Sequence, residues 1–110
     1  MDTQELQNIL ASQKEFYRKG KTRSVAFRIK QLKTLKASIK KYESDITEAL
    51  YQDLRKTAFE AYATEIGLVY EELNRHIRKL KRWCKPKRRR TPLSNFNGSS
   101  YIMHEPYGHV

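Results

Sequence analysis

Cys84 is the only thiol in the chain, and a thiol is the side chain best suited to nucleophilic chemistry. A nucleophilic role would require a neighbouring base and a pocket. His76 precedes Cys84 by about two helical turns if the segment between them is helical. We therefore interpret Cys84 as a half-buried packing residue at the end of a helix.

The sequence also lacks the patterns of a metal, phosphate or acid–base site. His76, His104 and His109 do not have the spacing of metal ligands. Glu71 and Glu72 are adjacent, so a helix would point their carboxylates in different directions. The glycines are scattered rather than gathered in a phosphate-binding loop, and they are Gly20, Gly67, Gly98 and Gly108. We predict no catalytic, cofactor-binding or metal-binding residue in this chain.

The basic charge of the chain allows an alternative function. The net charge is +11, and Arg75 to Arg90 holds ten basic residues without an acid. Within it, Lys85–Arg90 resembles a phosphate-binding or localisation run, but Trp83 is the only aromatic residue near it. We interpret the run as a solvated connector. The alternative is an independent basic helical module that binds nucleic acid non-specifically, and a peripheral membrane or scaffold helix set is a third hypothesis.

Hydrophobic spacing predicts a mainly α structure, with helices over about residues 2–19, 24–43, 44–56 and 57–84. Asp2 is placed to cap the first helix, with Glu5 completing a capping box, and Gly20 is placed to end that helix. Thr57 and Glu60 form a second capping-box pattern. Pro86 disfavours helix at the preceding residue. A break or kink is expected within Tyr42-Glu43-Ser44-Asp45.

The chain changes character after the last helix. We predict a helical region over 1–84, a basic connector over 85–91 and a hairpin and strand segment over 92–110. Asn97-Gly98 is the best hairpin signal, and Tyr101–His104 is typical of a short strand. The ending on His109-Val110 suggests an interrupted protein.

Length and composition indicate one small domain with a polar surface. The chain has 110 residues, of which 38% are hydrophobic and 32% charged. We find no secretory signal pattern and no apolar run of membrane-spanning length. A single cysteine excludes an internal disulfide. These features predict a cytoplasmic protein.

Short segments in a specific order cover almost the whole chain. They are Gly20-Lys21-Thr22-Arg23, Phe27–Leu32, Glu48–Leu50 with Asp53–Lys56, Glu60–Tyr62 with Glu65–Ile66, Trp83, and Glu105–Val110. Each is weak alone. The series resembles the N-terminal segment of aldehyde dehydrogenases of the class 3 and fatty-aldehyde group.

This resemblance implies the N-terminal part of an α/β enzyme that oxidises aldehydes to carboxylic acids with NAD or NADP. In that family a cysteine thiolate attacks the aldehyde, hydride passes to the nicotinamide, and a glutamate-activated water hydrolyses the thioester. We expect those residues beyond Val110, because Cys84 does not match the nucleophile's motif. These 110 residues alone are expected to be inactive and to bind no cofactor.

The resemblance also implies partners. The helices are expected to pack around the coenzyme domain, and the segment near Tyr101 to join a small sheet that bridges subunits. The expected partners are therefore the remainder of the enzyme chain and, at full length, a second subunit in a homodimer. Without them, exposed apolar stripes should make the chain self-associate. No specific nucleic-acid partner is expected.

Overall fold

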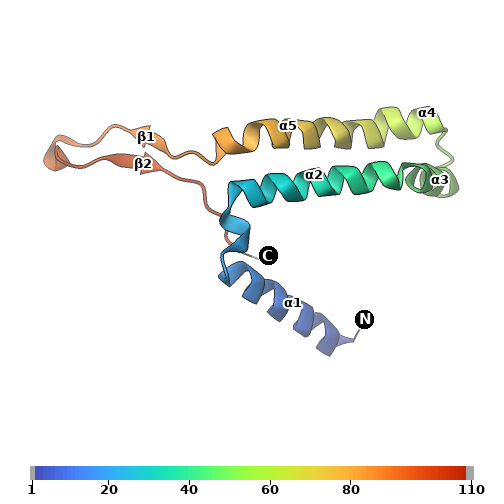
Figure 1. Cartoon of the computed structure of the whole chain (residues 1–110), viewed down its shortest axis with the longest axis horizontal. Helices are drawn as coiled ribbons and strands as arrows, with labels where there is room; N and C mark the ends of the chain where they lie inside the picture. The colour runs from blue at the N-terminus through green and yellow to red at the C-terminus, as the bar shows by residue number, and fades with distance from the viewer. Residues whose placement is uncertain (1, 109–110) are drawn as a thin grey trace. The chain divides into compact units, whose positions relative to one another are not determined.

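The computed structural model describes residues 2–108, which form two compact units (Figure 1). One unit holds the residues up to Val25 and those from Lys81 onward, and the other holds Ala26–Leu80. The elements in chain order are α1 (Thr3–Arg18), the 3-10 turn η1 (Lys21–Arg23), α2 (Val25–Lys41), α3 (Glu43–Leu54), α4 (Ala58–Ala61), the π turn η2 (Tyr62–Ile66), α5 (Gly67–Trp83), β1 (Lys87–Arg89), the 3-10 turn η3 (Leu93–Asn95) and β2 (Ser100–Ile102). The predicted mainly α fold with a short hairpin is confirmed.

In the first unit, α1 ends where the sequence predicts but begins without its predicted cap. Asp2 occupies the N-cap position, yet its side chain makes no capping hydrogen bond, so the expected capping box with Glu5 is wrong. Gly20 takes the left-handed conformation, with φ 70°, and its N–H donates to the carbonyl of Tyr17 at 2.9 Å. The Tyr17 hydroxyl donates to the carbonyl of Pro106 at 2.8 Å, which ties α1 to the C-terminal segment.

The hairpin of this unit differs from the prediction in both its first strand and its turn. Lys87–Arg89, predicted to be part of a solvated connector, forms β1 and pairs antiparallel with Ser100–Ile102. The backbone of a basic run can join a ladder while its side chains stay in water, and all three side chains are exposed. The connection is longer than a two-residue turn: Gly98 has no positive φ, and its N–H donates to the carbonyl of Asn95 at 2.8 Å.

In the second unit, α2 and α5 run side by side in opposite directions (Figure 1). The predicted break after α2 falls at Tyr42, and α3 begins at Glu43. Lys36 Nζ donates to Asn74 Oδ1 at 2.7 Å and so links α2 to α5. No helix within residues 2–108 is long and apolar enough to cross a membrane.

The predicted helix over 57–84 is interrupted by the π turn η2. The N–H of Gly67 donates to the carbonyl of Tyr62, five residues earlier, where an α-helix would use the residue four earlier. The helix then continues and ends at Trp83, as expected from Pro86. The hydrophobic core near this turn is small: among the described residues, the buried hydrophobic side chains are Ala61, Ile66 and Leu73.

Candidate functional site

The structure places His76 within α5 and Cys84 just after the end of that helix. His76 lies on α5, and its Nδ1 is 2.8 Å from the backbone carbonyl oxygen of Glu72 and 3.6 Å from the Glu72 carboxylate. These contacts engage the imidazole with the preceding turn of its own helix. Cys84 is half-buried just after the end of α5, and eight residues of helix correspond to roughly 12 Å of rise. The packing interpretation of Cys84 stays a prediction.

The predicted absence of a metal site also stays a prediction. Within residues 2–108, no three histidine, cysteine, aspartate or glutamate side chains are grouped to hold a metal ion. His104 is exposed beyond the end of β2. His109, the third histidine of the sequence analysis, lies outside the described residues.

The glycines do not build a cradle for the phosphates of a dinucleotide. Gly20 and Gly108 have positive φ values, but Gly20 follows α1 and Gly108 packs against the ring of Tyr17. Gly67 lies inside a helix, and Gly98 lies in the hairpin connection. A phosphate-binding loop needs glycines gathered between a strand and a helix N-terminus. The described glycines therefore do not form such a loop, and the predicted absence of a coenzyme-binding residue stays a prediction.

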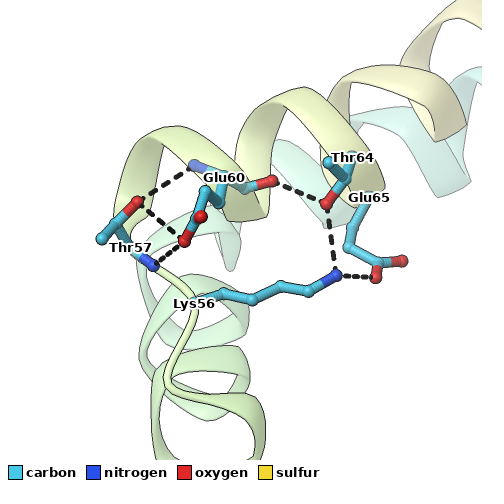
Figure 2. A network of polar contacts seen from close by, with 5 residues as sticks. All are labelled: Lys56, Thr57, Glu60, Thr64 and Glu65. Carbon is cyan, nitrogen blue, oxygen red and sulfur yellow. Dashed lines mark hydrogen bonds and ion pairs between the residues drawn. The ribbon is translucent and has the colours of Figure 1, made fainter.

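The densest polar cluster lies at the start of α4 (Figure 2). The Thr57 hydroxyl oxygen accepts from the Glu60 N–H at 3.3 Å, and the Glu60 carboxylate accepts from the Thr57 N–H at 3.0 Å. This is the capping box that the sequence predicts, and it satisfies two N–H groups that the helix leaves free.

Lys56 extends this cluster into the π turn. Its ammonium group donates to Thr64 Oγ1 at 3.2 Å and pairs with the Glu65 carboxylate (Figure 2). The Lys56 side chain is only 26% exposed. The cluster therefore fixes the chain between α3 and α4, and sequence reasoning missed the contacts of Lys56. The sequence signal that could have indicated these contacts is the position of Lys56 just before the capping box.

A second polar contact joins α3 to α5. The Tyr70 hydroxyl donates to Glu43 Oε2 at 2.6 Å. This hydrogen bond to Glu43, together with desolvation, raises the pKa of Tyr70 to about 12, so the phenol stays neutral at ordinary pH. The ring of Tyr62 lies 6.4 Å from that of Tyr70, and Tyr62 itself is exposed. The hydrogen bond therefore links α3 to α5.

The remaining feature of this unit is an apolar groove between α2 and α5. Its apolar lining comes from Leu32, Leu68, Val69 and Leu73, and Glu72 and His76 also line it. Leu68 is 53% exposed, so the groove is open and nothing in the described chain covers it. Such a surface suits packing against another protein segment better than chemistry.

Comparison with known proteins shows which family the chain resembles. The chain is 50% identical over 97 residues to 4,4'-diaponeurosporen-aldehyde dehydrogenase of Staphylococcus aureus, and 36% identical over 97 residues to aldehyde dehydrogenase family 3 member B1 of Mus musculus. Each alignment covers 88% of this chain and 21% of the relative. The substrate-bound structure of Staphylococcus aureus AldH matches 97% of this chain with a TM-score of 0.90 and 44% identity. The chain is homologous to the N-terminal part of family 3 aldehyde dehydrogenases.

The homology is confined to one segment of these aldehyde dehydrogenases. The chain spans about a fifth of the length of the curated relatives that it matches. No protein-family model matches the chain. The resemblance inferred from the ordered motifs is confirmed, and relatives that are aldehyde dehydrogenases by name give the nucleic-acid alternative no support.

Proposed function

We propose that these 110 residues are the N-terminal helical segment of an aldehyde dehydrogenase that oxidises aldehydes to carboxylic acids with NAD or NADP. The observation that carries the proposal is the match of 97% of the chain to 23% of the AldH chain of Staphylococcus aureus. The segment contributes packing and subunit contacts. The nucleophile, the general base and the coenzyme contacts belong to the remainder of the enzyme.

The surface of the chain supports a packing role. Residues 2–108 contain three buried hydrophobic residues, which is a small core, while large apolar side chains such as Phe59 and Leu54 are 81% and 59% exposed. The groove lined by Leu32, Leu68 and Val69 adds to this uncovered apolar surface. Its burial against the remainder of the enzyme would stabilise both parts.

The proposal extends to the assembly and the compartment. At full length the enzyme forms a homodimer, and without its remainder the chain self-associates through its uncovered apolar surface. The chain has a single cysteine and so cannot form an internal disulfide, which is consistent with a cytoplasmic location. Cell fractionation of the full-length enzyme tests the location.

Reconstitution tests the central proposal. The chain is mixed with a Staphylococcus aureus AldH that lacks the matched segment, and aldehyde-dependent NADH formation is followed. We expect the mixture to form NADH when neither part does so alone. Leu68→Asp, which places a charge in the apolar groove, should abolish the recovery, whereas Thr34→Asp on the exposed surface of α2 should leave it intact.

Two results would contradict the proposal. One is a mixture of two folded parts that stays inactive while the intact AldH is active under the same conditions. The other is equal recovery with the wild-type chain and with Leu68→Asp, because the groove would then make no contact that the enzyme needs.

A further inference from the structure

Tyr17 joins two segments of the first unit that lie far apart in the sequence. Its hydroxyl donates to the carbonyl of Pro106 at 2.8 Å, across 89 positions of the chain. Its ring also lies against Gly108, because a Cβ added to this glycine would be 3.6 Å from a ring carbon. The half-buried tyrosine therefore holds the turn over residues 106–108 by a polar and an apolar contact at once.

The backbone of this turn depends on glycine at its last position. Gly108 has a φ of 120°, a conformation that residues with a side chain rarely adopt. The 3.6 Å between the added Cβ and the Tyr17 ring is an ordinary van der Waals distance, so the ring leaves room for a methyl group. The path of the chain at Gly108, and not a lack of space, therefore requires the glycine.

The packing around this contact is incomplete within the chain. None of the residues of α1, Thr3–Arg18, is buried. An open hollow beside the contact is lined by Ser12, Gln13, Phe16, Tyr17, Thr22 and Gly108. A segment with few buried apolar contacts opens at a lower free energy than the rest of a protein. One hydrogen bond is then a large part of what keeps α1 and the turn together.

We propose that the contact of Tyr17 with Pro106 and Gly108 is a latch through which α1 and the turn attach and release together. The second unit, Ala26–Leu80, stays folded during release, because its helices have their own link between Lys36 and Asn74. The coupling acts in both directions, so a change that loosens the turn also loosens α1, and the reverse. The latch is a property of this chain and does not depend on the proposed catalytic role.

Hydrogen–deuterium exchange of the whole 110-residue chain, read on its proteolytic peptides, tests the latch. Tyr17→Phe removes the hydroxyl and keeps the ring, and Gly108→Ala disturbs the other end of the contact. Tyr107→Phe is the matched control, because it removes the same group from a fully exposed side chain in the same turn. All variants are compared at one protein concentration, and circular dichroism confirms that each keeps its helices.

The latch predicts changes at both ends of the contact. Losing a hydrogen bond of ordinary strength shifts an opening equilibrium by about fivefold. Tyr17→Phe should therefore speed exchange by about fivefold in α1 and at the amides of Tyr107 and Gly108. Gly108→Ala should speed exchange of the distant α1 by about fivefold or more, since alanine is strained at this φ. Exchange over residues 26–80, and throughout Tyr107→Phe, should change by less than about twofold.

Three results would overturn the latch. Unchanged exchange of α1 in Tyr17→Phe would show that the hydroxyl does not hold the helix. Faster exchange confined to the altered end of the contact in each variant would show that α1 and the turn are not coupled. An equal rise over residues 26–80 would show that the variants loosen the whole chain and not the first unit by itself.

Discussion

Replacing Gly67 with alanine should destabilise the chain, although alanine is the better helix former. Gly67 begins α5, and its N–H closes the π turn on the carbonyl of Tyr62. A Cβ added at Gly67 would lie 2.8 Å from that carbonyl oxygen and 3.3 Å from a carbon of the Tyr62 ring. The first distance is too short for a carbon and an oxygen that are not bonded, and the oxygen is backbone, so the turn itself must move.

The expected change in the free energy of unfolding of Gly67→Ala follows from two opposed effects. In an ordinary helix, the change from glycine to alanine gains about 1 kcal/mol. Here the added methyl group forces a local shift that costs about 1–3 kcal/mol, and a weakened Gly67–Tyr62 hydrogen bond costs about 1 kcal/mol more. We expect the free energy of unfolding to fall by about 1–3 kcal/mol.

Urea unfolding followed by far-ultraviolet circular dichroism measures this change. Ala37→Gly, at an exposed position of α2, is the matched control and should cost about 1 kcal/mol. Glycine and alanine are thus exchanged in opposite directions, yet both variants should unfold at lower urea. If Gly67→Ala instead raises the midpoint, the steric reasoning about the π turn is refuted.

Four further outcomes are expected. Thr57→Ala removes one hydrogen bond of the capping box and should lower the free energy of unfolding by about 1 kcal/mol in the same urea assay; an unchanged midpoint would contradict the role of the cap. The pKa of Tyr70 in the folded chain is raised to about 12, so Tyr70 should stabilise the fold fully below its ordinary pKa of 10.0 and lose this contribution as pH rises toward 12. In an absorbance titration, one tyrosine should ionise at higher pH than the others, and Glu43→Gln should remove this late step. A late step that persists in Glu43→Gln would contradict the assignment to Tyr70. Calorimetry of the chain with NAD and with NADP should give no saturable heat, and micromolar binding would overturn that expectation. Light scattering over a dilution series should show self-association, and a strict monomer at high concentration would mean that the chain closes its own core.

Local sequence signals correctly predicted most helix boundaries. The end of α1 just before Gly20, the break at Tyr42 and the capping box at Thr57 each depend on residues close together in the chain. Pro86 likewise ends α5 because it restricts the residue before it. Such effects act over one or two turns, so the sequence alone contains them. The exception is Asp2, whose side chain makes no capping bond despite a favourable residue type.

Long-range contacts account for what the sequence analysis missed. The basic run was predicted to be a connector because its charges favour water, but pairing with Ser100–Ile102 makes it β1. The Asn97-Gly98 pattern predicts a tight turn, yet the longer connection already brings the two strands together. Strand pairing depends on a partner more than ten residues away, which no local pattern specifies.

The sequence by itself determined the family segment, the helical content and the lack of recognised catalytic motifs, because each can be read from residue types at fixed spacing. Only the tertiary structure decided that Glu43 holds Tyr70, that Lys56 reaches Glu65, and that a π turn interrupts the last helix at Tyr62. These contacts depend on how α3, α4 and α5 approach one another. Their energies are small beside the hydrophobic and backbone effects that set the helices, so the linear pattern carries little trace of them.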